Sequence, residues 1–122
     1  MRVHHLALRT DDVGRLERFY DGVLGLGLLR RTPSGGVWLD SHGTIVMLEP
    51  RGAEEPKVAP GTMDLVAFAI EPAERAEIEG RLARAGVPIE ARTAYTLYLR
   101  DPDGRRLGLS SYPDELGRGD LG

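Results

Sequence analysis

Two aromatic residues and three arginines occupy positions from which they can bind a small molecule. Trp38 and Tyr98 each stand between two aliphatic neighbours, so in a β-strand each ring points to the face opposite those neighbours. Alternation places Arg9, Arg100 and Arg106 on the same face of their strands, and a guanidinium can hold a carboxylate or phosphate through two hydrogen bonds. The set predicts a site for a flat or anionic molecule. For a single arginine the solvated rim of a fold is the commoner place, and a large aromatic ring more often fills a core.

The rest of that face is lined mostly by small residues. Alternation adds Ala7, Met47, Ala67, Gly108 and Ser110 to it. The alanines and the glycine leave open volume, while Met47 and Ser110 are expected to contact a ligand. An apolar hollow with a few convergent polar groups is the usual form of a small-molecule site.

Several other chemistries are excluded. The chain has no cysteine, so it has neither disulfides, thiolate metal ligands nor a cysteine nucleophile. It contains no nucleophile elbow and no glycine loop with phosphate-binding spacing. The formal charge is −3 and the cationic residues are scattered among acids, which argues against nucleic acid as a partner.

An internal repeat shows which elements must position these residues. His5-Leu6-Ala7-Leu8 matches the segment 65–68, and the turn 40–43 matches the turn 101–104, with an offset of 60 or 61 residues. Between the matches, apolar residues recur every three or four positions and predict a helix that ends at Gly25 in one copy and at Gly86 in the other. Three short strand candidates follow each helix, so each copy is a βαβββ unit.

The predicted boundaries describe one domain of 122 residues. The first βαβββ unit covers 1–50, a linker rich in proline, glycine and charge covers 51–62, the second unit covers 63–112, and a tail without periodicity covers 113–122. The predicted helices span 13–23 and 72–85. The predicted strands outside the repeated first strand span 27–31, 36–40, 44–49, 88–93, 95–100 and 105–110.

The beginning of the chain has neither a basic start nor an apolar stretch of the kind found in signal peptides. No apolar run approaches the roughly 20 residues of a membrane span. We therefore expect a cytoplasmic protein that does not contact membranes.

Three of these features together resemble the vicinal oxygen chelate superfamily, which contains glyoxalase I, bleomycin-resistance proteins and extradiol dioxygenases. They are the HxAL strand at His5, the Phe19-Tyr20 pair followed by Leu24-Gly25, and the Asp-Pro-Asp-Gly turn at 101–104. The resemblance spans roughly residues 3–112. It implies an α+β fold in which the two tandem units form a curved eight-stranded cup with helices on the outer face, and it implies a homodimer.

The resemblance also implies a divalent-metal site with one ligand from the first and last strand of each unit. In the first unit these positions fall on His5 and Glu49, and in the second unit on Leu65 and Gly108. Leu65 and Gly108 supply no donor, so we expect an incomplete ligand set and no tightly bound metal. Glu49 is also the candidate for moving a proton. Alternatively, Glu49 is a strand-end carboxylate in solvent beside Pro50.

Three functions follow from this pattern. The leading hypothesis is a protein that binds a small aromatic or anionic molecule in its cup without a tightly held metal. The alternative is a divalent-metal-dependent lyase, isomerase or dioxygenase in which Asp64 or Ser110 replaces a lost ligand. An interaction module without a ligand is the third hypothesis, which the open face disfavours.

Overall fold

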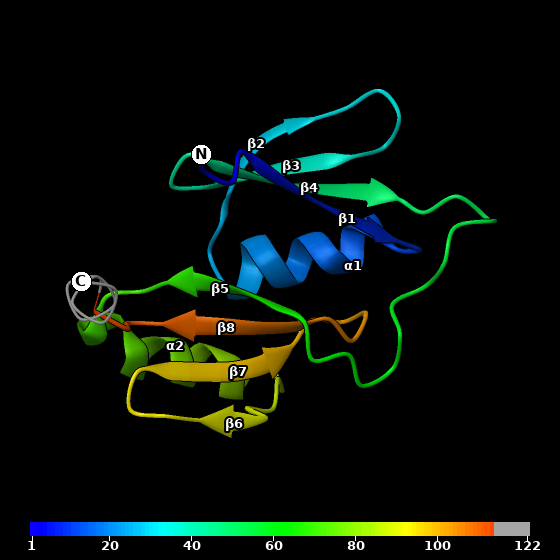
Figure 1. Ribbon diagram of the computed structural model, residues 1–122. Helices are drawn as coiled ribbons and strands as arrows, with labels where there is room; N and C mark the ends of the chain where they lie inside the picture. The colour runs from blue at the N-terminus through cyan, green and yellow to red at the C-terminus, as the bar shows by residue number, and fades with distance from the viewer. Residues whose placement is uncertain (114–122) are drawn as a thin grey trace. The chain divides into compact units, whose positions relative to one another are not determined.

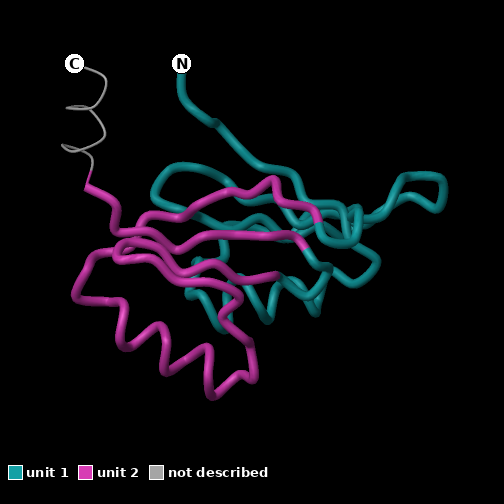
Figure 2. The backbone as a smooth tube through the Cα atoms, turned by 60° about the horizontal axis from the view of Figure 1, so that its bottom comes forward, with its two compact units in different colours: residues 1–61, 101–104 teal, residues 62–100, 105–122 magenta. Residues whose placement is uncertain are grey.

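The computed structural model describes residues 1–113, which divide into two compact units (Figure 2). Unit 1 contains residues 1–61 together with the turn Asp101–Gly104, and unit 2 contains residues 62–100 and the chain from residue 105 onward. The predicted tail lies outside the described residues except for Pro113. Within the described part, no helix has both the length and the apolar character needed to cross a membrane.

Unit 1 is built on a four-stranded sheet in the order β1-β4-β3-β2 (Figure 1). Its strands are β1 (His5–Thr10), β2 (Gly27–Arg31), β3 (Val37–Ser41) and β4 (Thr44–Pro50). β1 runs parallel to β4, whereas the β2–β3 and β3–β4 pairs are antiparallel. This is the order that a strand, a crossover helix and a three-stranded meander produce.

The helix of unit 1 covers one face of this sheet and changes winding along its length. It starts as α1 (Val13–Glu17), where the Asp12 side chain accepts a hydrogen bond from the Arg15 amide, and continues as the π-helix η1 (Arg18–Val23). The wider turn carries a Leu24 N–H···O=C Phe19 bond of 3.0 Å. Phe19 and Tyr20, although consecutive, are both buried, with 5% and 2% exposure. The predicted helix is confirmed, but its apolar periodicity did not reveal the π winding.

Unit 2 repeats the plan with the strand order β5-β8-β7-β6. The strands are β5 (Leu65–Ala69), β6 (Ala91–Arg92), β7 (Thr96–Arg100) and β8 (Arg106–Ser110), and β5 is parallel to β8. A 3-10 turn, η2 (Pro72–Glu74), leads into α2 (Arg75–Arg84), which buries Ile78 and Leu82. The strand expected over 88–93 is only two residues long.

The α+β fold with two tandem βαβββ units is confirmed, and its eight strands form two separate four-stranded sheets in the described residues. The helix-facing sides of the central strands are buried as alternation predicted, with Val46, Leu48, Leu107 and Leu109 at 3% exposure or less. Val66, on the edge strand β5, was also expected to pack under the helix but is 39% exposed.

The two repeated turns have different surroundings. Asp40 is exposed, and its carboxylate accepts a hydrogen bond of 3.0 Å from the Gly43 amide. Asp101 is 4% exposed; it accepts a 2.7 Å bond from the Tyr20 hydroxyl and a 2.9 Å bond from the Asp103 amide. Since Tyr20 and the turn Asp101–Gly104 belong to the same compact unit, the second turn contributes to the core of the first unit.

Candidate functional site

The face of the first sheet that the helix leaves open carries a row of four residues, one from each strand. Strand register places Ala7 beside Met47, Met47 beside Trp38 and Trp38 beside Arg30. The guanidinium carbon of Arg30 lies 4.9 Å from the centre of the indole ring, a distance at which a cation is attracted to the ring face. The row therefore offers a half-buried indole with a cation above it.

Glu49 holds this indole in place. Its Oε1 accepts a 3.1 Å hydrogen bond from the indole Nε1–H of Trp38. The carboxylate also lies against Gly36, where a Cβ atom would come within 2.5 Å of Oε2. A side chain at position 36 would displace the carboxylate, so Gly36 leaves the room in which Glu49 accepts the hydrogen bond from the indole.

The second sheet carries the equivalent row with different side chains. Ala67 lies beside Gly108, and Gly108 lies beside Tyr98. The guanidinium carbon of Arg106 is 4.4 Å from the centre of the phenol ring. A Cβ atom on Gly108 would contact the Thr96 methyl at 3.2 Å and the Ala67 Cβ at 3.4 Å. The floor of this row is thus small and close-packed.

A carboxylate braces the arginines of the second sheet. Glu90 accepts hydrogen bonds from Arg100 Nε at 2.6 Å and from Arg106 Nε at 3.2 Å. The hydrogen bond from Arg100 is the main cause that lowers the pKa of Glu90, and the same contact raises the pKa of Arg100. Arg100 also donates to the carbonyl of Thr62. The two arginines are therefore held in place by one acid.

Arg106 keeps donors for a ligand. Within residues 1–113 its hydrogen bonding is confined to the Nε contact with Glu90, so its two terminal amino groups are not used there. Its side chain is 12% exposed. A partly desolvated guanidinium beside an aromatic ring favours an anionic partner.

The structure brings the predicted ligand-binding residues together within each sheet. Trp38, Met47 and Glu49 meet on the first sheet, while Tyr98, Arg100, Arg106 and Ser110 share one face of the second. The Ser110 hydroxyl is 2.8 Å from that of Thr96. Arg9 pairs with Glu49 at the end of β1 and has an ion pair with Glu55.

The structure does not bring His5 and Glu49 together. His5 pairs with Ile45, whereas Glu49 pairs with Arg9, four residues farther along the same parallel strands. At about 3.3 Å per residue the two backbone positions are about 13 Å apart. The Nδ1 atom of His5 instead lies 3.0 Å from that of His4. A single ion held by these two side chains does not fit this geometry.

The register also corrects the counterpart of Gly108. Gly108 pairs with Ala67, and the equivalent pair in the first sheet is Met47 with Ala7. Glu49 therefore corresponds to Ser110, one row farther along. Of the four positions that the resemblance implies, His5 alone carries a strong metal donor. Within residues 1–113 there is no cluster of three or more His, Asp or Glu side chains suited to a metal, so the described residues do not fit a resident divalent ion.

Sequence reasoning missed Arg30 and Glu90. The pairing of β2 with β3 shifts register between Leu28 and Arg30, and this irregularity breaks the simple alternation that assigns side chains to faces. Glu90 precedes the short β6, and its amide donates to the Tyr98 carbonyl at 2.8 Å. The sequence signal that could have indicated Glu90 was the presence of Arg100 on β7 and Arg106 on β8, since two neighbouring arginines favour an acidic partner.

Comparisons with known proteins agree with this architecture. A virulence protein of Salmonella typhimurium, STM3117, is 28% identical over 127 residues, which cover 91% of this chain and 84% of that protein. The fosfomycin resistance protein FosX from Mesorhizobium loti has a TM-score of 0.79 and 17% identity, with 97% of each chain covered. A mutant fosfomycin resistance protein from Listeria monocytogenes, complexed with Mn(II) and 1S,2S-dihydroxypropylphosphonic acid, has a TM-score of 0.78 and 16% identity, covering 99% of this chain and 98% of that one. Residues 2–109 match the family model, and the chain belongs to the glyoxalase/bleomycin resistance protein/dioxygenase superfamily.

Proposed function

We propose that this protein binds a small anionic molecule with a flat or apolar part, and that it does so without a resident metal ion. The observation that carries the proposal is the contact of Arg106 with Tyr98, on the face that also carries Gly108 and Ala67. The exposed Ala67 and the half-buried phenol ring offer apolar contacts, and the guanidinium holds the anion. Membership of the superfamily supports a small molecule as the ligand.

Glu90 orients Arg106 before a ligand binds. An arginine that is already oriented loses less side-chain entropy when a ligand binds. Glu90 occupies the Nε side of Arg106, which leaves the terminal amino groups for two parallel hydrogen bonds to a carboxylate or phosphonate. The Listeria neighbour supports this ligand class, because it is complexed with a phosphonic acid.

Trp38 supports an aromatic or apolar contact on the first sheet and also supplies a readout. It is the only tryptophan of the chain, and Glu49 fixes its ring. Glu49 thereby acts as a positioning residue for the indole. A ligand on the first sheet should quench or shift the tryptophan emission, whereas a ligand confined to the second sheet need not do so.

The binding experiment uses calorimetric titration with phenylphosphonate and, as the uncharged comparison, benzyl alcohol. We expect saturable binding of the phosphonate and much weaker binding of the alcohol. Arg106→Met should weaken phosphonate binding about tenfold or more, which corresponds to about 1.4 kcal/mol. The matched control is Arg92→Met, which removes an exposed arginine ion-paired with Glu79. Equal affinity in the wild type and Arg106→Met would refute the role of Arg106.

Metal analysis separates this proposal from a metal-dependent lyase, isomerase or dioxygenase. We propose that zinc, nickel, cobalt, manganese and iron are not retained at one per chain after purification without chelator, because Met47, Leu65 and Gly108 offer no strong donor. A stoichiometric metal that disappears in His5→Ala would support the enzyme instead.

We also propose a homodimer. The strand order leaves β1 and β5 at sheet edges, and Leu65 and Val66 on β5 are 37% and 39% exposed. Exposed apolar edge strands are commonly covered by another chain. Light scattering should give twice the chain mass of 13.4 kDa, and a monomer across micromolar concentrations would contradict the proposal.

A further inference from the structure

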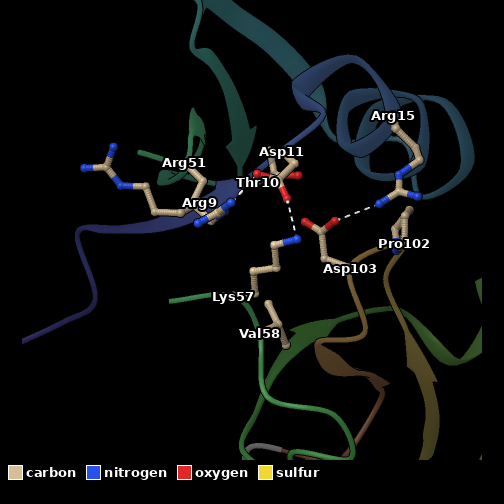
Figure 3. A pocket seen from close by; sticks show the side chains of 9 residues that line it. All are labelled: Arg9, Thr10, Asp11, Arg15, Arg51, Lys57, Val58, Pro102 and Asp103. Carbon is tan, nitrogen blue, oxygen red and sulfur yellow. Dashed lines mark hydrogen bonds and ion pairs between the residues drawn. The ribbon is translucent and has the colours of Figure 1, made fainter. Parts of the chain in front are cut away.

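A polar pocket opens in unit 1 where β1 ends. It has a volume of about 240 Å³ and is lined mainly by charged side chains from β1, the start of α1, the linker and the turn Asp101–Gly104. Figure 3 shows its lining, in which the ends of Lys57, Asp11 and Asp103 point toward one another. All of these residues belong to the same compact unit.

Cationic groups outnumber carboxylates in the lining. Four lining residues are cationic, and Asp11 and Asp103 are the two acids among them. Glu55 lies outside the lining and contacts one of the cations, Arg9, with an Nε–Oε2 distance of 3.6 Å. An excess of cations in the lining is notable because the whole chain has a formal charge of −3. Such a concentration of positive charge attracts anions.

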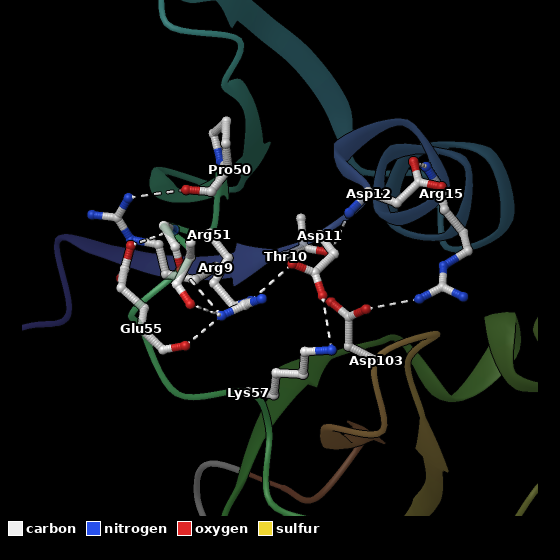
Figure 4. A network of polar contacts seen from close by, with 12 residues as sticks. Arg9, Thr10, Asp11, Asp12, Arg15, Pro50, Arg51, Glu55, Lys57 and Asp103 are labelled. Atoms are coloured by element: carbon white, nitrogen blue, oxygen red, sulfur yellow. Dashed lines mark hydrogen bonds and ion pairs between the residues drawn. The ribbon is translucent and has the colours of Figure 1, made fainter.

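Two of the cations are each held by one carboxylate of the lining (Figure 4). Arg51 donates from Nε to Asp11 at 2.8 Å and from Nη1 to the Gly52 carbonyl at 3.1 Å, and its side chain is 14% exposed. Arg15 donates to Asp103 at 2.9 Å. The hydrogen bond from Arg51 is also the main cause that lowers the pKa of Asp11. This contact favours the ionised form of Asp11, and both carboxylates are oriented by an arginine.

Lys57 is the loosely held cation. Its Nζ is 3.6 Å from Asp11 Oδ2, which is too long for a hydrogen bond. Within residues 1–113 the ammonium group makes no other polar contact. The side chain is 73% exposed. An ammonium carries three donors. Lys57 can therefore turn its donors to a ligand without breaking an internal hydrogen bond.

We propose that this pocket binds a small phosphorylated molecule that also carries hydroxyl groups. Lys57 and the remaining donors of Arg15 hold the phosphate, while the carboxylates of Asp11 and Asp103 accept hydrogen bonds from the hydroxyls. The volume lies below the roughly 300–1,000 Å³ of pockets for drug-sized ligands, so the pocket suits a short polyol phosphate better than a nucleotide. The carboxylates discriminate against a bare anion, which they repel.

The first test compares three ligands by calorimetry at constant ionic strength: glycerol 3-phosphate, inorganic phosphate and glycerol. We expect glycerol 3-phosphate to bind at least about tenfold more tightly than inorganic phosphate, and glycerol not to bind measurably. Lys57→Met should weaken glycerol 3-phosphate binding about tenfold, and Lys57→Arg should retain most of it. Equal binding to the wild type and Lys57→Met, or no saturable binding at all, would overturn the proposal. Preference for inorganic phosphate would overturn the role given to the hydroxyls.

The second test uses the fact that Lys57 is the only lysine. Acylation of its amine by an N-hydroxysuccinimide ester can be followed by mass spectrometry, with the amino group of Met1 as an internal reference. Glycerol 3-phosphate should slow labelling of Lys57 several-fold and leave labelling of Met1 unchanged. Equal protection of both amines would show that the ligand acts on the reagent or the medium, and would contradict the site. Arg106→Met should not alter this protection, which keeps the result independent of the function proposed for the second sheet.

Discussion

The open faces of the two sheets keep the same register but differ in almost every side chain. The row of the first sheet runs Ala7, Met47, Trp38 and Arg30, with the ring fixed from the side by Glu49. In the second sheet a glycine replaces the methionine, a phenol replaces the indole, and the acid that holds the arginines, Glu90, precedes β6. The duplicated backbone has therefore kept its pairing, while each face has acquired its own way of holding an aromatic ring.

The repeated turns differ in the same manner. Asp40 caps an exposed hairpin in which His42 and Gly43 have φ values of 47° and 95°. Asp101 is buried and binds the Tyr20 hydroxyl. One copy of the motif thus shapes a hairpin, and the other anchors a segment of the second repeat in the compact unit of the first.

The largest effect on stability is expected from removing the buried aspartate of the second turn. Asp101→Ala should lower the free energy of unfolding by about 1–3 kcal/mol, because the buried hydroxyl of Tyr20 then loses its acceptor. Asp40→Ala removes an exposed turn contact and should cost about 0.5 kcal/mol. Urea denaturation of both variants measures the comparison.

A double-mutant cycle attributes the loss to the hydrogen bond. Tyr20→Phe removes the donor without changing the ring, so Asp101→Ala should cost less in the Tyr20→Phe background than in the wild type. Equal costs for Asp40→Ala and Asp101→Ala would show that burial of Asp101 contributes no more than an exposed turn does.

The next effect compares the equivalent residues Glu49 and Ser110. Glu49→Ala leaves a half-buried indole N–H without its acceptor and should cost about 1 kcal/mol, with a shift in tryptophan emission. Ser110→Ala removes a hydroxyl contact with Thr96 and should leave the emission unchanged. Glu49→Gln keeps an acceptor and should restore most of the stability. An unchanged emission spectrum in Glu49→Ala would mean that the carboxylate does not fix the ring.

These differences show how far the sequence alone can predict this protein. Alternation and the internal repeat predicted both βαβββ units, because each strand buries one face and each helix one stripe. The equivalence of Met47 with Gly108 was available at the constant offset of 61 residues, which the turns at Asp40 and Asp101 also show. Glu49 appeared to be the counterpart because it offered a donor. The strand register, which depends on long-range hydrogen bonds, decides for Met47.

The contacts that define the candidate sites could not be predicted from local sequence patterns. Arg30 reaches the Trp38 face only because of the irregular pairing near Leu28. The charged pocket depends on the turn at Asp103 lying within reach of Arg15, which is 88 residues away in sequence. Composition and periodicity contain no information about contacts between residues so far apart in sequence.

A smaller effect is expected from Arg30. An arginine over an exposed aromatic face contributes about 0.5–1 kcal/mol, so Arg30→Met should cost about 0.5 kcal/mol, since the methionine keeps part of the apolar contact. The emission of Trp38 should change because the cation is gone. Arg31→Met, one position along and paired with Glu17, is the matched control and should leave the emission unchanged.

The smallest effect concerns Glu90, the acid that holds Arg100 and Arg106 on the second sheet. Hydrogen bonding from Arg100 and Arg106 lowers the pKa of Glu90 below its ordinary value of 4.5. The folded state therefore favours the ionised form, and the resulting stability is fully present above pH 4.5 and is lost as the pH falls through the lowered folded-state value. The difference in stability between wild type and Glu90→Gln should be constant from pH 5 to 8 and should shrink at lower pH. Solvent screening keeps it small. Denaturation at several pH values measures the difference, and one that grew on acidification would show that the arginines do not stabilise the carboxylate.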